Sequence, residues 1–113
     1  MEFTIKHATL VKDPEFIQSE NGNTIAKLTV AKDHFKVDGE DDDGNKTFEK
    51  IGVSYFDLVA FGEVADWFEG FTKGEHIEVT DGKIRQKKWE DRDGNTRYNY
   101  EFIVWDFEEM VYE

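Results

Sequence analysis

The segment YFDLVAFGEVADWFEGFTKG, residues 55–74, changes from an alternating pattern to a helical one at Gly62. Before Gly62 every second residue is apolar, which predicts a strand with one side in a core. The residues on that side are Phe56, Leu58 and Ala60. After Gly62 apolar residues recur at i, i+3, i+4 and i+7, which predicts a helix over residues 63–72. One long strand (residues 48–62) therefore leads directly into the only helix that the pattern indicates.

The expected helix presents a single apolar stripe. Its members are Val64, Trp67, Phe68 and Phe71. We interpret this stripe as the face that caps a barrel, so Trp67 is expected in the core and Trp67→Ala is expected mainly to lower stability. Lys73 and Gly74 supply the cation and the glycine that are typical of a helix end.

The remaining patterns predict strands separated by turns. Five strands are expected, at residues 3–11, 24–35, 48–62, 76–85 and 96–107. The stretch 19–23 contains the turn signal Asn-Gly, and Asp-Gly occurs at 43–44 and 93–94. Strand, strand, strand, helix, strand, strand is the order of an all-β OB-fold, a five-stranded Greek-key barrel with its helix between the third and fourth strands. We expect residues 1–113 to form this one domain.

Composition restricts the compartment and the partners. The chain has 113 residues, no cysteine and a formal net charge of −12. Disulfides and thiolate metal sites are therefore excluded, and no apolar run approaches the roughly 20 residues that span a bilayer. The N-terminus lacks a signal-like segment. A cytoplasmic protein with no membrane partner is expected.

The charges are unevenly distributed along the chain. Acids dominate an expected loop at residues 37–47, and no Lys or Arg follows Tyr98. The expected hairpin at residues 83–98 instead holds six of the 14 cations. These are Lys83, Arg85, Lys87, Lys88, Arg92 and Arg97. Trp89 lies among them. Cations that pair with phosphates around a ring that stacks on a base are typical of single-strand nucleic-acid binding.

Other aromatic residues fall on the sides of strands that are expected to face solvent. Phe35, Tyr55 and Phe61 lie there on the second and third strands, together with Lys27. These strands form the usual oligonucleotide face of an OB-fold. The candidate binding residues are therefore Phe35, Tyr55, Phe61, Trp89, Tyr98, Lys27 and the six hairpin cations.

The sequence contains no recognisable catalytic or metal site. His7, His34 and His76 lie on different expected strands without triad-like partners. Aligning Gly44 with the glycine of a calcium loop puts Gly39 and Lys50 where carboxylates are needed. We expect no enzyme activity, no metal and no cofactor.

Five segments occur in an order that is typical of one family. They are LVKDPE (10–15), AKLTVA (26–31), LVAFGEVA (58–65), KG with DGKIR (73–85), and QKKWED with Gly94 and Arg97-Tyr98 (86–98). In this order they resemble the bacterial and phage single-stranded DNA-binding proteins, over nearly the whole length from about His7 to Phe107.

The resemblance implies sequence-independent coating of single-stranded DNA in replication, recombination and repair. It assigns base stacking to Phe35, Tyr55, Phe61 and Trp89. Phe35 and Tyr55 stand where well-known cellular members carry Trp, and Asp57 and Glu63 stand where a basic residue is common.

Cellular members of that family usually continue into a Gly/Pro-rich tail with an acidic tip. This sequence ends at Glu113, soon after the last expected strand, so it is similar to a compact phage or mobile-element version. The bacterial host cytoplasm is then the expected location. A homodimer or homotetramer is expected, with recombination or replication proteins as possible partners.

Two alternatives compete with DNA binding. The charge of −12 is compatible with an acidic protein-interaction module or DNA mimic on an OB-fold. An enzyme or sugar-binding module would need a carboxylate pair in a cleft, and the sequence indicates none.

Overall fold

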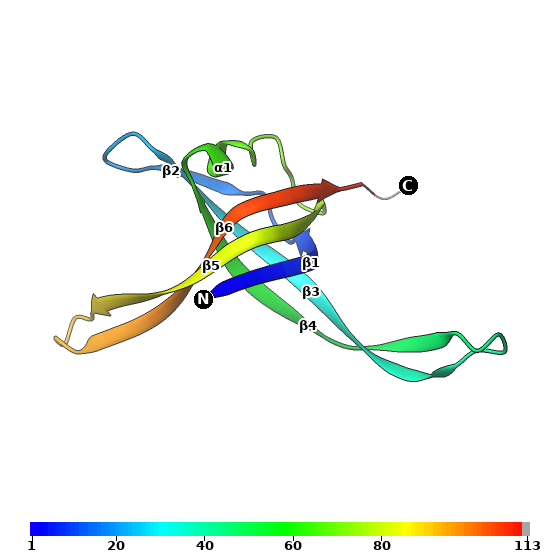
Figure 1. Cartoon of the computed structure of the whole chain (residues 1–113). Coiled ribbons are helices and arrows are strands. Elements are labelled where there is room, and N and C mark those ends of the chain that lie inside the picture. Colours follow the sequence, from blue (N-terminus) through cyan, green and yellow to red (C-terminus); the bar gives the residue numbers. More distant parts are fainter. Residues whose placement is uncertain (112–113) are drawn as a thin grey trace.

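The computed structural model of the chain describes residues 1–111, which form six strands and one helix (Figure 1). The elements are β1 (Glu2–Leu10), β2 (Glu15–Gln18), β3 (Thr24–Glu40), β4 (Lys46–Phe61), α1 (Gly62–Asp66), β5 (His76–Glu90) and β6 (Thr96–Met110). All five predicted strands are present. The four-residue β2 was not predicted; it follows Pro14, has four exposed residues and pairs with the start of β3.

Five strands close into a barrel in the order β1-β5-β6-β4-β3. The end of β1 completes it by pairing with β3, through Thr9 with Ala31 and Leu10 with Val30. The neighbouring strands are antiparallel except β4 and β6, which run parallel. The OB-fold prediction is confirmed, with the helix between β4 and β5.

Alternation along the strands fills the barrel as the sequence predicted. Leu28, Leu58 and Phe102 form a row across β3, β4 and β6, which continues to Ile84 on β5. Leu28 and Leu58 are buried, and Phe102 packs against the same core. Because side chains alternate between the two sides of a strand, the next residue on each strand must face away from this core.

The helix is shorter than predicted and its aromatic residues are placed differently. It spans only Gly62–Asp66, and the following bonds run from Phe68 N to Ala65 O and from Phe71 N to Phe68 O. These three-residue steps tighten the turn, which then reaches Gly70 at a positive φ of 87°. The predicted helix is therefore present, but its predicted extent, residues 63–72, was too long.

The tighter turn exchanges the expected roles of two neighbouring rings. Phe68 is fully buried and stacks on Phe107, with ring centroids 4.0 Å apart and an interplanar angle of 12°. Trp67 is instead 47% exposed, although its ring lies 6.3 Å from that of Phe107. The prediction that Trp67 lies in the core was wrong: Trp67 makes the last four-residue bond, from its N–H to Glu63 O, and the turn tightens at Phe68, which takes the core position instead.

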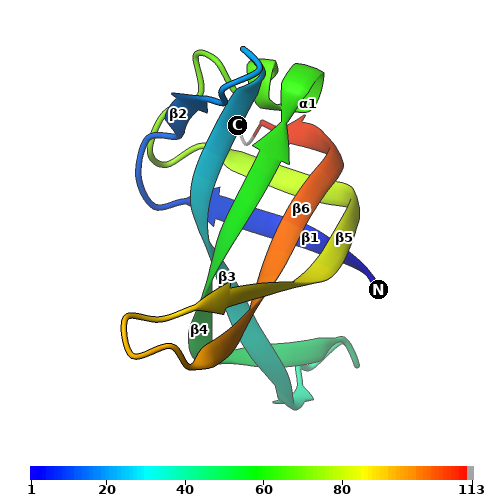
Figure 2. The same cartoon turned by 90° about the vertical axis from the view of Figure 1, so that its left-hand side faces the viewer.

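Two strand pairs continue far beyond the barrel as arms. The predicted acidic loop at 37–47 is mostly β3 and β4, and its true turn is Asp41–Asn45. The basic hairpin likewise consists of β5 and β6 joined by a turn at Asp91–Asn95. The two arms diverge on opposite sides of the barrel (Figures 1 and 2). Their length explains a radius of gyration of 17.4 Å, against roughly 13 Å for a compact domain of this size.

All three hairpins turn in the same way. The turns are SENGN (19–23), DDDGN (41–45) and DRDGN (91–95). In each, the first residue accepts from the glycine N–H and donates its own N–H to the carbonyl of the fifth residue. The glycines have φ of 79–81°, a region that side chains disfavour. The glycine signals in the sequence thus marked every turn correctly.

Candidate nucleic-acid interface

Strand register places residues of four strands on one solvent-facing side of the barrel. Lys27 pairs with Val59, Val59 with Ile103, and Ile103 with Lys83. This row is one residue away from the core row of Leu28 and Leu58, so its side chains point away from that core, with Ile103 itself covered by its neighbours. We call the side of β3, β4, β5 and β6 that carries this row the outer face.

The outer face continues along the β5–β6 arm. On β5 this side of the arm carries Arg85, Lys87 and Trp89, every second residue after Lys83. Their partners on β6 are, in the same order, Glu101, Asn99 and Arg97. The Asn99 amide, with its oxygen toward the indole, accepts a hydrogen bond from Trp89 Nε1 at 3.0 Å. This bond orients the ring while 43% of the residue stays exposed.

Two predicted binding residues lie on the opposite side of the same arm. Lys88 and Tyr98 are partners there, and Tyr98 is exposed. Arg92 lies in the turn at the tip. The hairpin therefore carries candidate cations on both sides, but only one side is continuous with the barrel's outer face.

Exposed rings also lie on the outer face of β4. Tyr55 is 67% exposed and pairs with Ala31, and Phe61 begins the step into α1. The Arg85 guanidinium carbon lies 6.0 Å from the centroid of the Phe61 ring. The prediction that both rings face solvent is confirmed.

Phe35 lies elsewhere, towards the seam between β1 and β3. It lines a pocket of about 100 Å³ together with His7, Thr9 and Lys32. A bulge between His34 and Phe35 shifts the pairing there, so that Phe35 is opposite Lys50. Partial burial, and then the neighbouring His76, lower the pKa of His7. Phe35 is exposed and lies on β3 past its pairing with β1, towards the β3–β4 arm, which diverges from the β5–β6 arm (Figure 1).

Several acids on the outer face are engaged by neighbours. Arg85 Nη2 donates to Glu101 Oε1 at 2.7 Å, and Thr29 Oγ1 donates to Asp57 Oδ1 at 2.9 Å. Within residues 1–111, Lys27, Lys87, Lys88 and Arg92 form no ion pair. These four cations are therefore available to an anion without displacing an internal partner.

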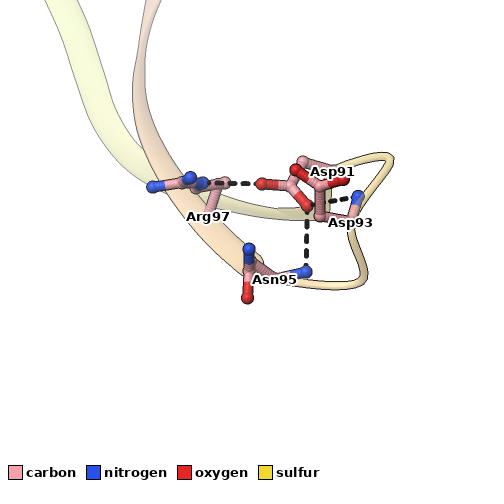
Figure 3. Close-up of polar contacts among 4 residues, drawn as sticks. All are labelled: Asp91, Asp93, Asn95 and Arg97. Atoms are coloured by element: carbon pink, nitrogen blue, oxygen red, sulfur yellow. Dashed lines mark hydrogen bonds and ion pairs between the residues drawn. The ribbon is translucent and has the colours of Figure 1, made fainter.

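The arm tip is ordered by one carboxylate. Asp91 accepts from the backbone N–H groups of Asp93 and Asn95 and from Arg97 Nε at 2.9 Å (Figure 3). The Arg97 guanidinium, followed by the Asn95 N–H, lowers the pKa of Asp91. Arg97 is thus both a candidate phosphate contact and part of the turn.

A groove of about 520 Å³ opens where β4 and β6 separate. Only Leu58 with Phe102 and Val59 with Ile103 are paired between these strands. Towards the arms, β4 and β6 diverge from that short contact. Lys27, Lys87 and Tyr100 line the groove that opens there. The groove also contains the acids Glu15, Asp57 and Glu101, each of which accepts a hydrogen bond from a neighbouring side chain.

The sequence interpretation missed three exposed rings near this face. Tyr100 is exposed beside the groove, and Trp67 and Trp105 line a second cleft with Phe61. Trp105 follows Ile103 at the outward spacing of β6, so strand alternation could have identified it. Trp67 could not be found in this way because the helical pattern suggested a core position.

Comparison with known proteins agrees with the barrel fold. Residues 3–110 match the model of the single-strand binding protein family. The chain belongs to this family. Membership in a family defined by binding also confirms that the domain is not an enzyme. No helix within residues 1–111 is long and apolar enough to cross a membrane.

Similar curated proteins are bacterial members of this family. The chain is 26% identical over 95 residues to a single-stranded DNA-binding protein of Thermotoga maritima, covering 84% of this chain and 63% of that protein. It is 29% identical over 101 residues to one of Clostridium perfringens, covering 88% and 59%. The family member described here therefore spans about three fifths of the length of these relatives.

Solved structures share the fold at lower identity. A deletion mutant of the Thermus aquaticus single-stranded DNA binding protein superposes with a TM-score of 0.72 at 20% identity, covering 97% of this chain and 49% of that one. A Plasmodium falciparum SSB complex with ssDNA gives a TM-score of 0.72 at 16% identity, covering 97% and 94%. Both likenesses concern the barrel fold.

Proposed function

We propose that this domain binds single-stranded DNA without sequence preference, through base stacking on aromatic rings and pairing of phosphates with Lys and Arg. The observation that carries the proposal is the outer face itself. Tyr55, Phe61 and Trp89 are exposed on it, and Lys27 and Lys87 lie between them beside an open groove. The names of the curated relatives support the same ligand.

The mechanism follows from the chemistry of these side chains. Every base has a π-face, so a ring accepts any base and stacking is worth roughly 1–3 kcal/mol per base. Cations contact the phosphates, which are the same in every sequence. In this proposal the strand runs from Trp89 on the arm, past Lys87 and Lys27, to Phe61. Three further cations along this route, Lys83, Arg85 and Arg97, already pair with carboxylates. In this proposal each of them contacts a phosphate as well as its carboxylate.

The remaining predicted contacts are placed beside this route. Phe35 would receive a strand that crosses β3 towards β1, and Lys88, Tyr98 and Arg92 would hold one that wraps around the arm. The proposal also includes roles in replication, recombination and repair, in a cytoplasmic and phage-like setting. We also propose that the chain forms a homodimer or homotetramer and contacts recombination or replication proteins.

The decisive experiment is a binding titration with fluorescently labelled oligo-dT, followed by anisotropy at low and increasing salt. Tight binding that weakens as salt rises is expected, because phosphate contacts release counterions. Trp89→Ala is expected to weaken binding roughly 5- to 100-fold, the equivalent of one lost stack. Melting curves of the variant check that the arm mutation leaves the barrel intact.

Duplex DNA and a neutral oligosaccharide of similar length serve as comparison ligands. Preference for oligo-dT over both is expected. Absence of oligo-dT binding at low salt would overturn the proposal, and binding of a basic protein instead would favour the acidic interaction module or DNA mimic.

A further inference from the structure

A cleft of about 470 Å³ lies beyond Phe61, between α1 and the upper part of β6. Phe61, Trp67 and Trp105 provide aromatic walls, and Val64 and Ile103 line it as well. Trp105 is 51% exposed, so two indole rings remain accessible beside a third ring. Large apolar rings rarely stay exposed together on a protein surface without a ligand or partner.

Cations lie directly against these rings. Lys83 Nζ is 4.9 Å from the centroid of the Trp105 ring, and the Arg85 guanidinium lies over Phe61. Both cations come from β5 and follow the same outer side as Lys87 and Trp89. These cations lie at the edge of the cleft, against its rings, rather than in its lining, so the cleft adjoins the cationic route described above. A phosphate chain held by them can turn its bases towards the rings.

The charged residues that line the cleft itself are acids, on the far side of Trp105 from Arg85 in the strand register. Asp81 and Asp106 line it there, and Asp106 Oδ1 accepts from the backbone N–H of Phe107 at 2.9 Å. Carboxylates repel phosphates, so the anionic backbone is confined to the side of Lys83 and Arg85. What enters between the indoles is then a neutral, flat group, which is the description of a nucleobase.

We propose that this cleft is an additional base-stacking site, in which Trp67 and Trp105 extend the DNA path beyond Phe61. This inference rests on the proposed function, since it adds a site to the same strand. It assigns binding roles to two tryptophans outside the set that the sequence predicted. It also makes Lys83 the phosphate contact that accompanies this site.

Fluorescence can report on this cleft alone. The double variant Trp67→Phe/Trp89→Phe leaves Trp105 as the single tryptophan and keeps a ring at each replaced position. Titration with oligo-dT is expected to quench its emission, as stacking on a base requires. An unchanged emission at saturating oligo-dT, with binding verified by anisotropy of the labelled DNA, would overturn the proposal.

Affinity provides the second readout. Trp105→Ala is expected to reduce affinity for long oligo-dT roughly 5- to 100-fold, with a smaller effect on short oligomers that reach only the arm and groove. Trp105→Phe, which keeps a ring, is expected to retain most of the affinity. Phe48→Ala is a matched control, because Phe48 is an exposed ring on the other arm, near the acidic turn at Asp41–Asn45.

The outcomes separate this proposal from the function on which it rests. If the unmodified chain does not bind oligo-dT, the proposed function fails and the cleft site fails with it. If binding persists and Trp89→Ala weakens it, but Trp105→Ala changes only the oligomeric state measured by light scattering, the cleft is a contact between copies. That result overturns the stacking site alone.

Discussion

Arg85 of β5 and Glu101 of β6 are cross-strand partners on the outer face, joined by a 2.7 Å hydrogen bond from Arg85 Nη2 to Glu101 Oε1. The pair shows how a chain with a net charge of −12 can present a cationic route. On this face Glu101 is paired with Arg85, and Asp57 accepts a hydrogen bond from Thr29. The acidic turn lies at the end of the other arm (Figure 1). The net charge alone would have suggested a basic protein, rather than a nucleic acid, as the partner.

Replacing Glu101 by Gln is expected to strengthen binding to single-stranded DNA. The change keeps an acceptor for Arg85 but removes a negative charge beside the proposed phosphate route. An increase of about two- to fivefold is expected, since exposed ion pairs are worth up to about 1 kcal/mol. Anisotropy titrations at low and high salt measure it, and the gain should shrink as salt screens the charges.

Glu49→Gln is the matched control for that experiment. It removes the carboxylate 3.8 Å from Lys36 on the β3–β4 arm, and so changes the net charge equally. Its affinity is expected to stay at the unmodified level. An equal gain in both variants would show that total charge, rather than the position of Glu101, determines affinity.

Gly82→Ala is expected to lower the free energy of unfolding by about 1–3 kcal/mol, the usual cost of overpacking a core. Gly82 is buried between Phe3 of β1 and Val104 of β6. An added Cβ would overlap the Phe3 ring and lie 2.9 Å from the Ile103 carbonyl oxygen. Urea denaturation measures the change.

Gly52→Ala provides the comparison for Gly82. Gly52 is also a strand glycine, but an added Cβ there meets nothing within 4 Å. Its free energy of unfolding is expected to be unchanged or slightly higher, because alanine restricts the unfolded chain. Equal destabilisation of the two variants would contradict the packing explanation.

The contribution of the Asp91 carboxylate to the free energy of unfolding is expected to be lost in acid. The pKa of Asp91 is lowered in the folded chain, so between that pKa and the ordinary one the unfolded chain binds more protons. The stabilisation is therefore present at neutral pH and is lost as pH falls through the folded pKa. Carboxyl NMR titration should find a midpoint below the usual Asp range, and Arg97→Gln should raise it. The same midpoint in both proteins would exclude Arg97 as the main cause.

Phe68→Ala and Trp67→Ala are expected to differ sharply in stability. Phe68 is fully buried against Phe107, and removing such a ring typically costs about 3–5 kcal/mol. Trp67 is half exposed, so its removal should change the free energy of unfolding by less than about 1 kcal/mol. Denaturation curves measure both variants. A larger loss of unfolding free energy in Trp67→Ala than in Phe68→Ala would favour the prediction that Trp67 is the core residue.

Local chemistry explains which features could be predicted. Glycines after Asn or Asp mark all three turns, because each needs a positive φ that other residues resist. Alternation identified Leu28, Leu58, Tyr55 and Phe61 correctly, since a strand has a period of two wherever it lies. The lengths of the arms were underestimated because charged strand ends resemble loops in composition.

Features that depended on neighbouring strands were predicted less well. The helical stripe could not show that the turn tightens at Phe68, which decides that Phe68 packs and Trp67 does not. Trp105 was overlooked because its importance comes from Lys83 and Phe61, residues that are far away in sequence. The ion pair between Arg85 and Glu101 also requires the register of two strands.

The sequence by itself determined the order of the helix and the five barrel strands, the hairpin turns, the core-facing side of the second and third barrel strands, and the concentration of cations around Trp89. These are properties of neighbouring residues, which short-range sterics and alternation control. Only the tertiary structure decided that Lys27, Val59, Ile103 and Lys83 form one row, and that Trp67 and Trp105 share a cleft. Barrel closure and strand register bring those residues together, and no local pattern encodes that proximity.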